Sequence, residues 1–360
     1  MEKLIKISRK FLLTTFCFIG AAIIFTSCDK DDDTPEVVLA QDFAQVNLVA
    51  SSATFTGARV DANFINGWGI AFSPTGNAWI SSEGKGTSVI YDKTGAEKLA
   101  AVTIPSATAA TGGSPTGQVF NGTTDFVIPG GASVARFIFA GTDGVISGWS
   151  SGGAAVKLID RSSTSAYTGL AIGVSGTSNY LYAANFRSGK IDVFDKTFAV
   201  VSMSFTDPNL PSGYAPFNIQ AIGTQLYVLY AKVDATTHEE QKGAGFGYVS
   251  IFNMDGTFVK RFLSGGALNA PWGIAQAPTT FMDSGAASIL IGNFGDGMIN
   301  AYDLSGTFLG SLRKSGAPIV IDGLWAIAFA PATATTVDPN WLFFAAGPGD
   351  ETQGLYGYIN

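Results

Sequence analysis

The chain of 360 residues contains one histidine, His238, and this limits the chemistry that its side chains can perform. A serine triad would depend on this histidine as its general base. A zinc site would need a second histidine or a cysteine beside His238, and the expected folded part has neither. The two cysteines, Cys17 and Cys28, belong to an N-terminal segment that we expect to be processed. We expect His238 to lie in an exposed loop within the polar stretch 236–242. The sequence therefore disfavours histidine-, zinc- and thiol-based catalysis.

Carboxylate and amide side chains are the groups that remain for metal chemistry. Glu83, Asn185 and Asn293 fall in alternate units of a sequence repeat, so they could point towards one axis from three directions. Their oxygens suit Ca²⁺ or Mg²⁺. The alternative for the two asparagines is a role in turns, because asparagine tolerates left-handed backbone geometry. We therefore expect no cofactor, with a divalent ion as the open alternative.

Aromatic side chains beside amides and carboxylates could instead bind a polar organic ligand such as a sugar or a peptide. Trp68, Trp272 and Trp325 recur at equivalent positions of the repeat, so packing between repeat units is the alternative role for them. The candidate ligand-binding residues are Asn66, Trp68, Glu83, Asn185, Arg187, Asn218, Trp272, Asn293, Asp296, Asp322 and Trp325.

A repeat of glycine-led segments must position these residues. Six times a glycine begins a stretch of alternating apolar residues that ends five positions later on a large apolar side chain, and the intervals are 58, 45, 58, 50 and 57 residues. Each unit contains four β-rich segments and turns such as Asp255-Gly256. This pattern predicts an all-β fold, a six-bladed β-propeller with four-stranded antiparallel blades. The six glycines are Gly86, Gly144, Gly189, Gly247, Gly297 and Gly354.

A second repeated motif marks the first strand of each blade. Copies that end on alanine occur at 68–71, 169–171, 219–221, 272–275 and 325–328, and the double interval after the first predicts a hidden copy near 124–129. The last unit has only three strands before Asn360. We expect the N-terminal segment 43–48 to add the fourth strand and to close the ring, because closure removes exposed strand edges. The propeller then spans 42–360.

The order of strands in a blade predicts where a site lies. The loop that leads into the first strand and the loop that joins the second strand to the third must emerge on the same face of the propeller. The candidate residues fall at or beside these loops, so the sequence predicts a binding site on that face.

Four segments carry a resemblance to a known family. They are FAQVNL at 43–48, NGWGIAFSP at 66–74, GNFGDGMINAYD at 292–303 and AAGPGD at 345–350. The chain resembles a family of secreted bacterial six-bladed propellers that lacks an established function and is related to NHL-repeat and gluconolactonase-like proteins. The resemblance covers roughly 43–360 and implies the fold but no catalytic residue. Gluconolactonase-like relatives hold a divalent ion in a comparable way, which implies Glu83 or Asp296 as metal ligand or base in the alternative function.

The N-terminus predicts export and a lipid anchor. Positions 1–27 combine four basic residues with a long apolar run, which is typical of a signal peptide. The segment 25–28 resembles a lipobox in which Cys28 would carry lipid, and an acidic stretch at 29–33 resembles a surface-export signal. The alternative for this acidic stretch is an ordinary solvated tether. In either case 28–41 comprises the lipidated Cys28 and an acidic linker. Removal of the four basic residues and the one acidic residue of 1–27 leaves 17 basic and 27 acidic residues, a formal charge of −10, which disfavours nucleic acid as a partner.

These observations predict a non-enzymatic lipoprotein of the outer membrane, exposed on the cell surface and held by lipid on Cys28. Its propeller would bind a protein, a peptide or a glycan. The alternative is a metal-dependent hydrolase or lactonase of gluconolactonase-like type. Propeller lyases and quinone-dependent dehydrogenases that use histidine are disfavoured.

Overall fold

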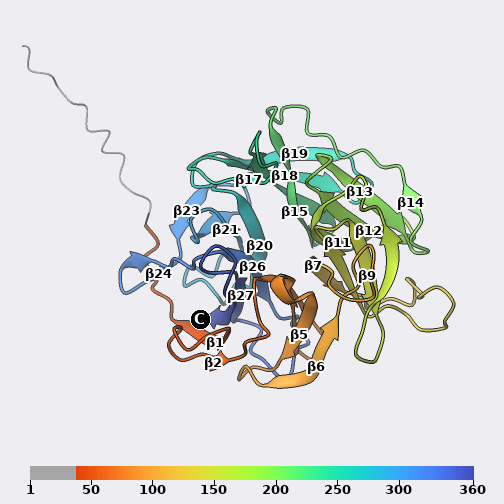
Figure 1. The fold of residues 1–360 in the computed structure, drawn as a ribbon. Coiled ribbons are helices and arrows are strands. Elements are labelled where there is room, and N and C mark those ends of the chain that lie inside the picture. The colour runs from red at the N-terminus through yellow and green to blue at the C-terminus, as the bar shows by residue number, and fades with distance from the viewer. Residues whose placement is uncertain (1–37) are drawn as a thin grey trace, which may run out of the picture. The chain divides into compact units, whose positions relative to one another are not determined.

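The computed structural model describes residues 38–360, which form six antiparallel sheets around a common axis (Figure 1). The predicted all-β, six-bladed propeller is confirmed. Among residues 38–360, no helix is long and apolar enough to cross a membrane, and η1 (Glu83–Lys85) is a single short 3-10 turn. The predicted signal peptide, Cys28 and most of the predicted tether lie outside the described residues.

Each of the first three blades is a sheet of four consecutive strands, with the innermost strand named first. Blade 1 is β3 (Gly67–Phe72), β4 (Ala78–Ser82), β5 (Thr87–Tyr91) and β6 (Glu97–Thr103). Blade 2 is β7 (Pro115–Phe120), β8 (Phe137–Gly141), β9 (Val145–Trp149) and β10 (Val156–Asp160). Blade 3 is β11 (Tyr167–Ser175), β12 (Ser178–Asn185), β13 (Lys190–Asp195) and β14 (Val200–Val201).

The other blades carry short additions. Blade 4 is β15 (Tyr214–Ile222), β16 (Gln225–Val233), β18 (Gly247–Asn253) and β19 (Phe258–Ser264), with β17 (Glu240–Gln241) paired to β16. Blade 5 is β20 (Pro271–Ala277), β21 (Ser288–Asn293), β22 (Ile299–Asp303) and β23 (Phe308–Ser311), followed by the hairpin of β24 (Arg313–Lys314) and β25 (Ala317–Pro318). Blade 6 begins with β26 (Leu324–Phe329), β27 (Leu342–Ala346) and β28 (Leu355–Ile359).

The N-terminal strand closes the ring, as predicted. β1 (Gln45–Ala50) pairs antiparallel with β28, and the short β2 (Arg59–Val60) follows it in parallel. Val49 and Ala50 are fully buried, so the strand contributes to the core as well as to the backbone pairing. The strand overlaps the predicted segment 43–48 but begins and ends two residues later. Within that segment, Phe43 stacks on Phe281 of blade 5 at 4.9 Å between ring centroids.

The hidden first strand of blade 2 was placed wrongly by the sequence pattern. It is β7 at 115–120, and the predicted region 124–129 belongs to the loop between β7 and β8. Thr116 and Gln118 occupy positions that are apolar in most other blades, so the motif is not visible there. Within the predicted region, Phe126 is fully buried but holds a left-handed φ of 62°, which a regular strand does not allow.

The innermost strands approach one another very closely, which explains their small residues. A Cβ atom added at Gly69 would lie 2.5 Å from the Thr116 carbonyl oxygen, and one at Gly117 would lie 2.5 Å from the Leu170 nitrogen. Backbone therefore packs on backbone between blades 1, 2 and 3, where only glycine fits.

Candidate functional site

The innermost strand of every blade contains a register shift near its beginning. The shifts lie between Gly67 and Ile70, Pro115 and Gln118, Tyr167 and Gly169, Pro216 and Asn218, Pro271 and Gly273, and Leu324 and Ile327. Such bulges change the direction of the side chains that they contain. The residues in the shifts include Trp68, Thr116, Thr168, Phe217, Trp272 and Trp325.

The aromatic residues at these bulges pack together at the axis with Phe294, and we call the five residues the aromatic plug (Trp68, Phe217, Trp272, Phe294 and Trp325). Trp325 stacks on Trp68 at 3.6 Å and on Phe294 at 3.9 Å between centroids. Trp272 meets Trp68 and Trp325 edge to face at 6.0 and 5.9 Å. Because the members come from blades 1, 4, 5 and 6 and are at most 5% exposed, the plug fills the centre of the ring.

Hydrogen bonds fix two of the indole rings in the plug. The Trp272 Nε1 donates to the Thr168 carbonyl oxygen at 3.0 Å, and the Trp325 Nε1 donates to Asn66 Oδ1 at 3.0 Å. This burial supports the packing role that the recurrence of the three tryptophans suggested. A ligand contact by Trp68, Trp272 or Trp325 stays a prediction.

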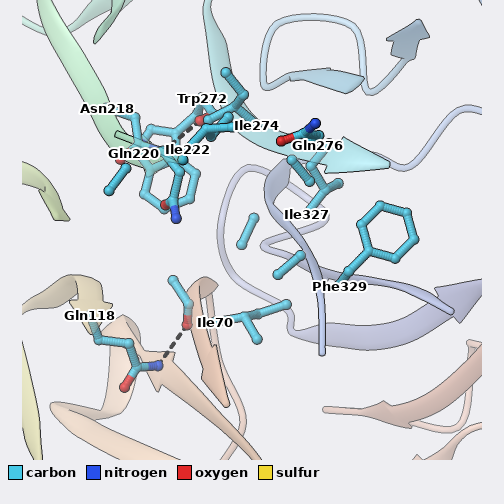
Figure 2. A pocket seen from close by; sticks show the side chains of 16 residues that line it. Ile70, Gln118, Asn218, Gln220, Ile222, Trp272, Ile274, Gln276, Ile327 and Phe329 are labelled. Atoms are coloured by element: carbon cyan, nitrogen blue, oxygen red, sulfur yellow. Dashed lines mark hydrogen bonds between the residues drawn. The ribbon is translucent and has the colours of Figure 1, made fainter. Parts of the chain in front are cut away.

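An axial channel lies on one side of the plug, where the innermost strands end and turn into the second strands. We call this side the hairpin face and the side where the innermost strands begin the start face. The inner cavity of the channel has a volume of about 310 Å³ and reaches Trp272. It continues into an outer cavity of about 670 Å³ that shares several wall residues with it. Figure 2 shows the side chains around the inner cavity: Ile70, Gln118, Asn218, Gln220, Ile222, Trp272, Ile274, Gln276, Ile327 and Phe329.

Three glutamines of the channel wall have different roles. Gln118 is buried and bonded on all sides, since its Nε2 donates to the carbonyl oxygens of Gly69 and Trp79 at 2.7 Å and its Oε1 accepts from Ser88 at 3.2 Å. Gln220 and Gln276 are exposed to the channel, and neither amide has a hydrogen-bond partner among residues 38–360. Two amides are thus available to a ligand.

The channel wall is uncharged. None of the residues that line the two cavities, all within the described part of the chain, is ionisable. Partly exposed apolar side chains, among them Ile70, Ile222 and Phe329, alternate with the two amides around the space. Such a wall can bind by packing and hydrogen bonding, and its own side chains offer no proton donor or acceptor with a pKa near neutrality.

Of the predicted site residues, Asn218 and Trp272 line the inner cavity, whereas most of the others are on the opposite, start face. There, Asn66 Nδ2 donates to Glu351 Oε2 at 2.6 Å and to Glu83 Oε2 at 3.2 Å, while its Oδ1 accepts from Trp325. Asn66 and Glu351 both have left-handed φ values, 50° and 65°. The predicted residues Asn66 and Glu83 therefore do come together. Glu351, which sequence reasoning missed, follows Asp350 in the same type of loop that supplies Glu83.

The insertion in blade 4 that contains β17 (Glu240–Gln241) lies against the carboxylates of Glu83 and Glu351. Lys242 places its Nζ 4.3 Å from the centroid of the Phe294 ring in the plug. Burial, together with the neighbouring Glu351 and Glu239, raises the pKa of Glu240 to about 7. Burial also raises the pKa of Glu351. The start face thus carries partly buried carboxylates directly above the plug.

Replacement of Glu240 by glutamine is expected to stabilise the protein at alkaline pH. Because the pKa of Glu240 in the folded protein lies above its ordinary value of 4.5, folding is favoured while the group is protonated, and this contribution is lost as pH rises from about 4.5 to 7. We expect a gain of about 1–3 kcal/mol in the free energy of unfolding at pH 8 and almost none at pH 4.5. Urea unfolding at both pH values measures it. Glu97→Gln, at an exposed position of β6, is the control, and an equal gain for Glu240→Gln at both pH values would contradict the assignment.

The remaining asparagines of the prediction are buried and hydrogen-bonded to neighbouring segments of the chain. Asn185 Oδ1 accepts from the backbone nitrogens of Ala166 and Ser188, at 3.2 Å each. Asn218 Nδ2 donates to the Trp272 carbonyl oxygen at 2.7 Å, which couples it to the plug. Asn293 Nδ2 donates to the Ala267 carbonyl oxygen at 2.8 Å. These bonds support the turn role that was the alternative for Asn185 and Asn293, and a packing role for Asn218.

The charged residues of the prediction are dispersed over the start face. Asp296 accepts from Asn269 Nδ2 at 3.2 Å, and Asp322 accepts from the Gly349 nitrogen at 2.8 Å. Arg187 lines a separate cavity of about 480 Å³ together with His238. His238 is exposed and lies in a loop, as the sequence predicted. The ligand-binding roles of these residues stay predictions.

No group of three or more histidine, cysteine, aspartate or glutamate side chains within residues 38–360 is arranged to hold a metal ion. Glu83, Asn185 and Asn293 are each bonded to different neighbours. A Ca²⁺ or Mg²⁺ ion, and the hydrolase or lactonase activity that would depend on it, stay predictions.

Solved structures share the fold. A protein of unknown function from Bacteroides thetaiotaomicron aligns with a TM-score of 0.56 and 12% identity over 89% of this chain and 77% of its own. A streptogramin B lyase aligns with a TM-score of 0.52 and 13% identity over 88% of this chain and 97% of its own. An aldose sugar dehydrogenase from Streptomyces coelicolor, solved with PQQ bound, aligns with a TM-score of 0.50 and 14% identity over 89% of this chain and 99% of its own. At these identities the likeness concerns the fold alone.

Sequence relatives are closer. No family model matches the chain. Two uncharacterized proteins of Acanthamoeba polyphaga mimivirus are 35% and 32% identical to it over 334 and 337 residues. Each alignment covers 88% of this chain, and they cover 80% and 85% of the viral proteins. The chain therefore belongs to one protein family with these two mimivirus proteins.

Proposed function

We propose that the chain is a binding protein whose axial channel holds an uncharged polar ligand, supplied by a protein, a peptide or a glycan. The observation that carries the proposal is the pair of amides, Gln220 and Gln276, that face the channel without a partner among residues 38–360. An amide presents both a donor and an acceptor, so each can make two hydrogen bonds with a ligand.

The form of the channel supports binding rather than passage. The aromatic plug separates the inner cavity from the start face, so that a ligand would enter from the hairpin face and stop near Trp272. The innermost strands form the walls and hold the amides in place before binding, which lowers the entropic cost of binding. The proposed site thus lies on the hairpin side of the plug, whereas the sequence predicted a site on the start face.

The test is a ligand screen with matched amide variants. In the double variant Gln220→Ala with Gln276→Ala, we expect affinity for the selected ligand to fall about 10- to 100-fold, since each lost hydrogen bond is worth about 1 kcal/mol. Isothermal titration calorimetry measures this. Gln241→Ala removes an amide from β17, outside the channel, and should leave affinity unchanged. A ligand that binds all three proteins equally would contradict the channel as the site.

We also propose that the protein reaches the outer membrane as a lipoprotein anchored at Cys28 and exposed at the cell surface. The support is the signal-like segment 1–27 and the lipobox-like 25–28 in the sequence. Detergent-phase partition of the protein, lost in Cys28→Ser, is the measurement; partition unchanged by the substitution would contradict it.

A further inference from the structure

We infer that the ligand of the axial channel is an uncharged peptide segment with apolar side chains, taken up without a charged chain end. This inference rests on the proposed binding function. It adds the class of ligand, which the chemistry of the channel wall narrows.

The backbone of the wall supports a peptide. β3, β15, β20 and β26 each pair with a neighbouring strand on one side only, so that their other edges face the axis. Such an edge presents N–H and C=O groups that an extended peptide can match. The side-chain amides of Gln220 and Gln276 present the same donor and acceptor pair, which complements a peptide group.

The apolar part of the wall favours a peptide over a glycan. Ile70, Ile222 and Phe329 are partly exposed in the channel and could pack against apolar side chains. A sugar would place hydroxyl groups against the isoleucines, which cannot bond to them, and would lose hydrogen bonds to water without replacement. The two side-chain amides alone are too few to satisfy the hydroxyl groups of a buried sugar ring, and the strand edges present their backbone groups at the spacing of an extended chain, which a peptide matches.

The lack of charge on the wall restricts the ligand further. An ammonium, a carboxylate or a free chain terminus near Trp272 would be removed from water with no ionisable partner among the lining residues, all within 38–360. The plug blocks a through passage, so an extended segment must turn or end there. An internal loop or an end-blocked peptide meets both conditions, whereas a free terminus does not.

The experiment compares three sets of probes on the full chain. The first is a library of N-acetylated, C-amidated octapeptides made of uncharged residues, the second is the best of these peptides with both ends free, and the third is an array of neutral glycans. We expect the end-blocked peptides to bind, and the same peptide with free ends to bind at least 10-fold more weakly. We also expect the end-blocked peptide to bind the Gln220→Ala, Gln276→Ala double variant at least 10-fold more weakly than the unchanged protein. Gln241→Ala is the matched control.

The outcomes separate this inference from the function on which it rests. Neutral glycans that bind through Gln220 and Gln276, with no peptide bound, would overturn the peptide inference and keep the binding function. Equal affinity for free and blocked ends would overturn the restriction on charge. Binding of neither peptides nor glycans would overturn both proposals. Circular dichroism of each variant must show an intact fold before its affinity is compared.

Discussion

Replacement of Trp325 by alanine is expected to lower the free energy of unfolding by about 3–5 kcal/mol. Trp325 is 1% exposed, stacks on Trp68 and Phe294, and donates to Asn66, so its removal leaves a large cavity among residues of four blades. The surrounding strands are held by their own sheets and cannot collapse into the space. Denaturant unfolding followed by tryptophan fluorescence and circular dichroism measures the loss.

Two variants show whether packing is the cause. Trp325→Phe keeps an aromatic ring against Trp68 and Phe294 but loses the hydrogen bond to Asn66. We expect it to lower the free energy of unfolding by about 1–2 kcal/mol. Trp149→Ala removes a partly exposed indole at the outer part of blade 2 and should cost less than Trp325→Ala. If Trp325→Ala kept full stability but lost ligand binding, the tryptophan would be a ligand contact instead of a structural residue.

Deletion of residues 43–50 is expected to abolish the soluble monomer or to lower the melting temperature by more than about 10 °C. The deletion removes β1, whose Val49 and Ala50 are fully buried, and exposes the whole edge of β28. An exposed edge of this kind invites pairing between molecules. Size-exclusion chromatography and thermal unfolding measure the two effects.

Point variants separate closure from a general effect of shortening. Val49→Asp places a charge in the core and should approach the effect of the deletion, whereas Ala44→Asp, at an exposed position before β1, should be nearly neutral. A synthetic peptide of residues 42–61 should restore solubility to the deleted chain. An equally stable, soluble monomer after deletion would mean that β1 does not hold the ring closed.

The order of the blades could be predicted because its signals are local. Each Gly-led strand, such as that at Gly297, alternates apolar and polar positions within a few residues, and its neighbours follow along the chain. β7 could not, because Thr116 and Gln118 replace the apolar residues of the motif. Their roles are set by other blades: Thr116 Oγ1 donates to the Tyr167 carbonyl oxygen at 2.7 Å, and Gln118 bonds to blade 1.

The candidate site was predicted less well, since it depends on residues that meet only across the ring. Asn66 and Glu83 lie in two loops at the same end of blade 1 and were both predicted, but Glu351 meets them from the other end of the chain. The channel amides Gln220 and Gln276 were missed because nothing in their local sequence distinguishes them from surface glutamines.

By itself, the sequence determined the number of blades, the order of their strands and the strand that closes the ring, since periodic alternation and turn residues act over short distances. Only the tertiary structure decided what the recurring tryptophans do. The bulges turn Trp68, Trp272 and Trp325 towards one axis, and closure of the ring brings Trp68 and Trp325 within 3.6 Å although they are far apart in the chain. Their packing blocks the centre and leaves the uncharged channel open to the hairpin face alone.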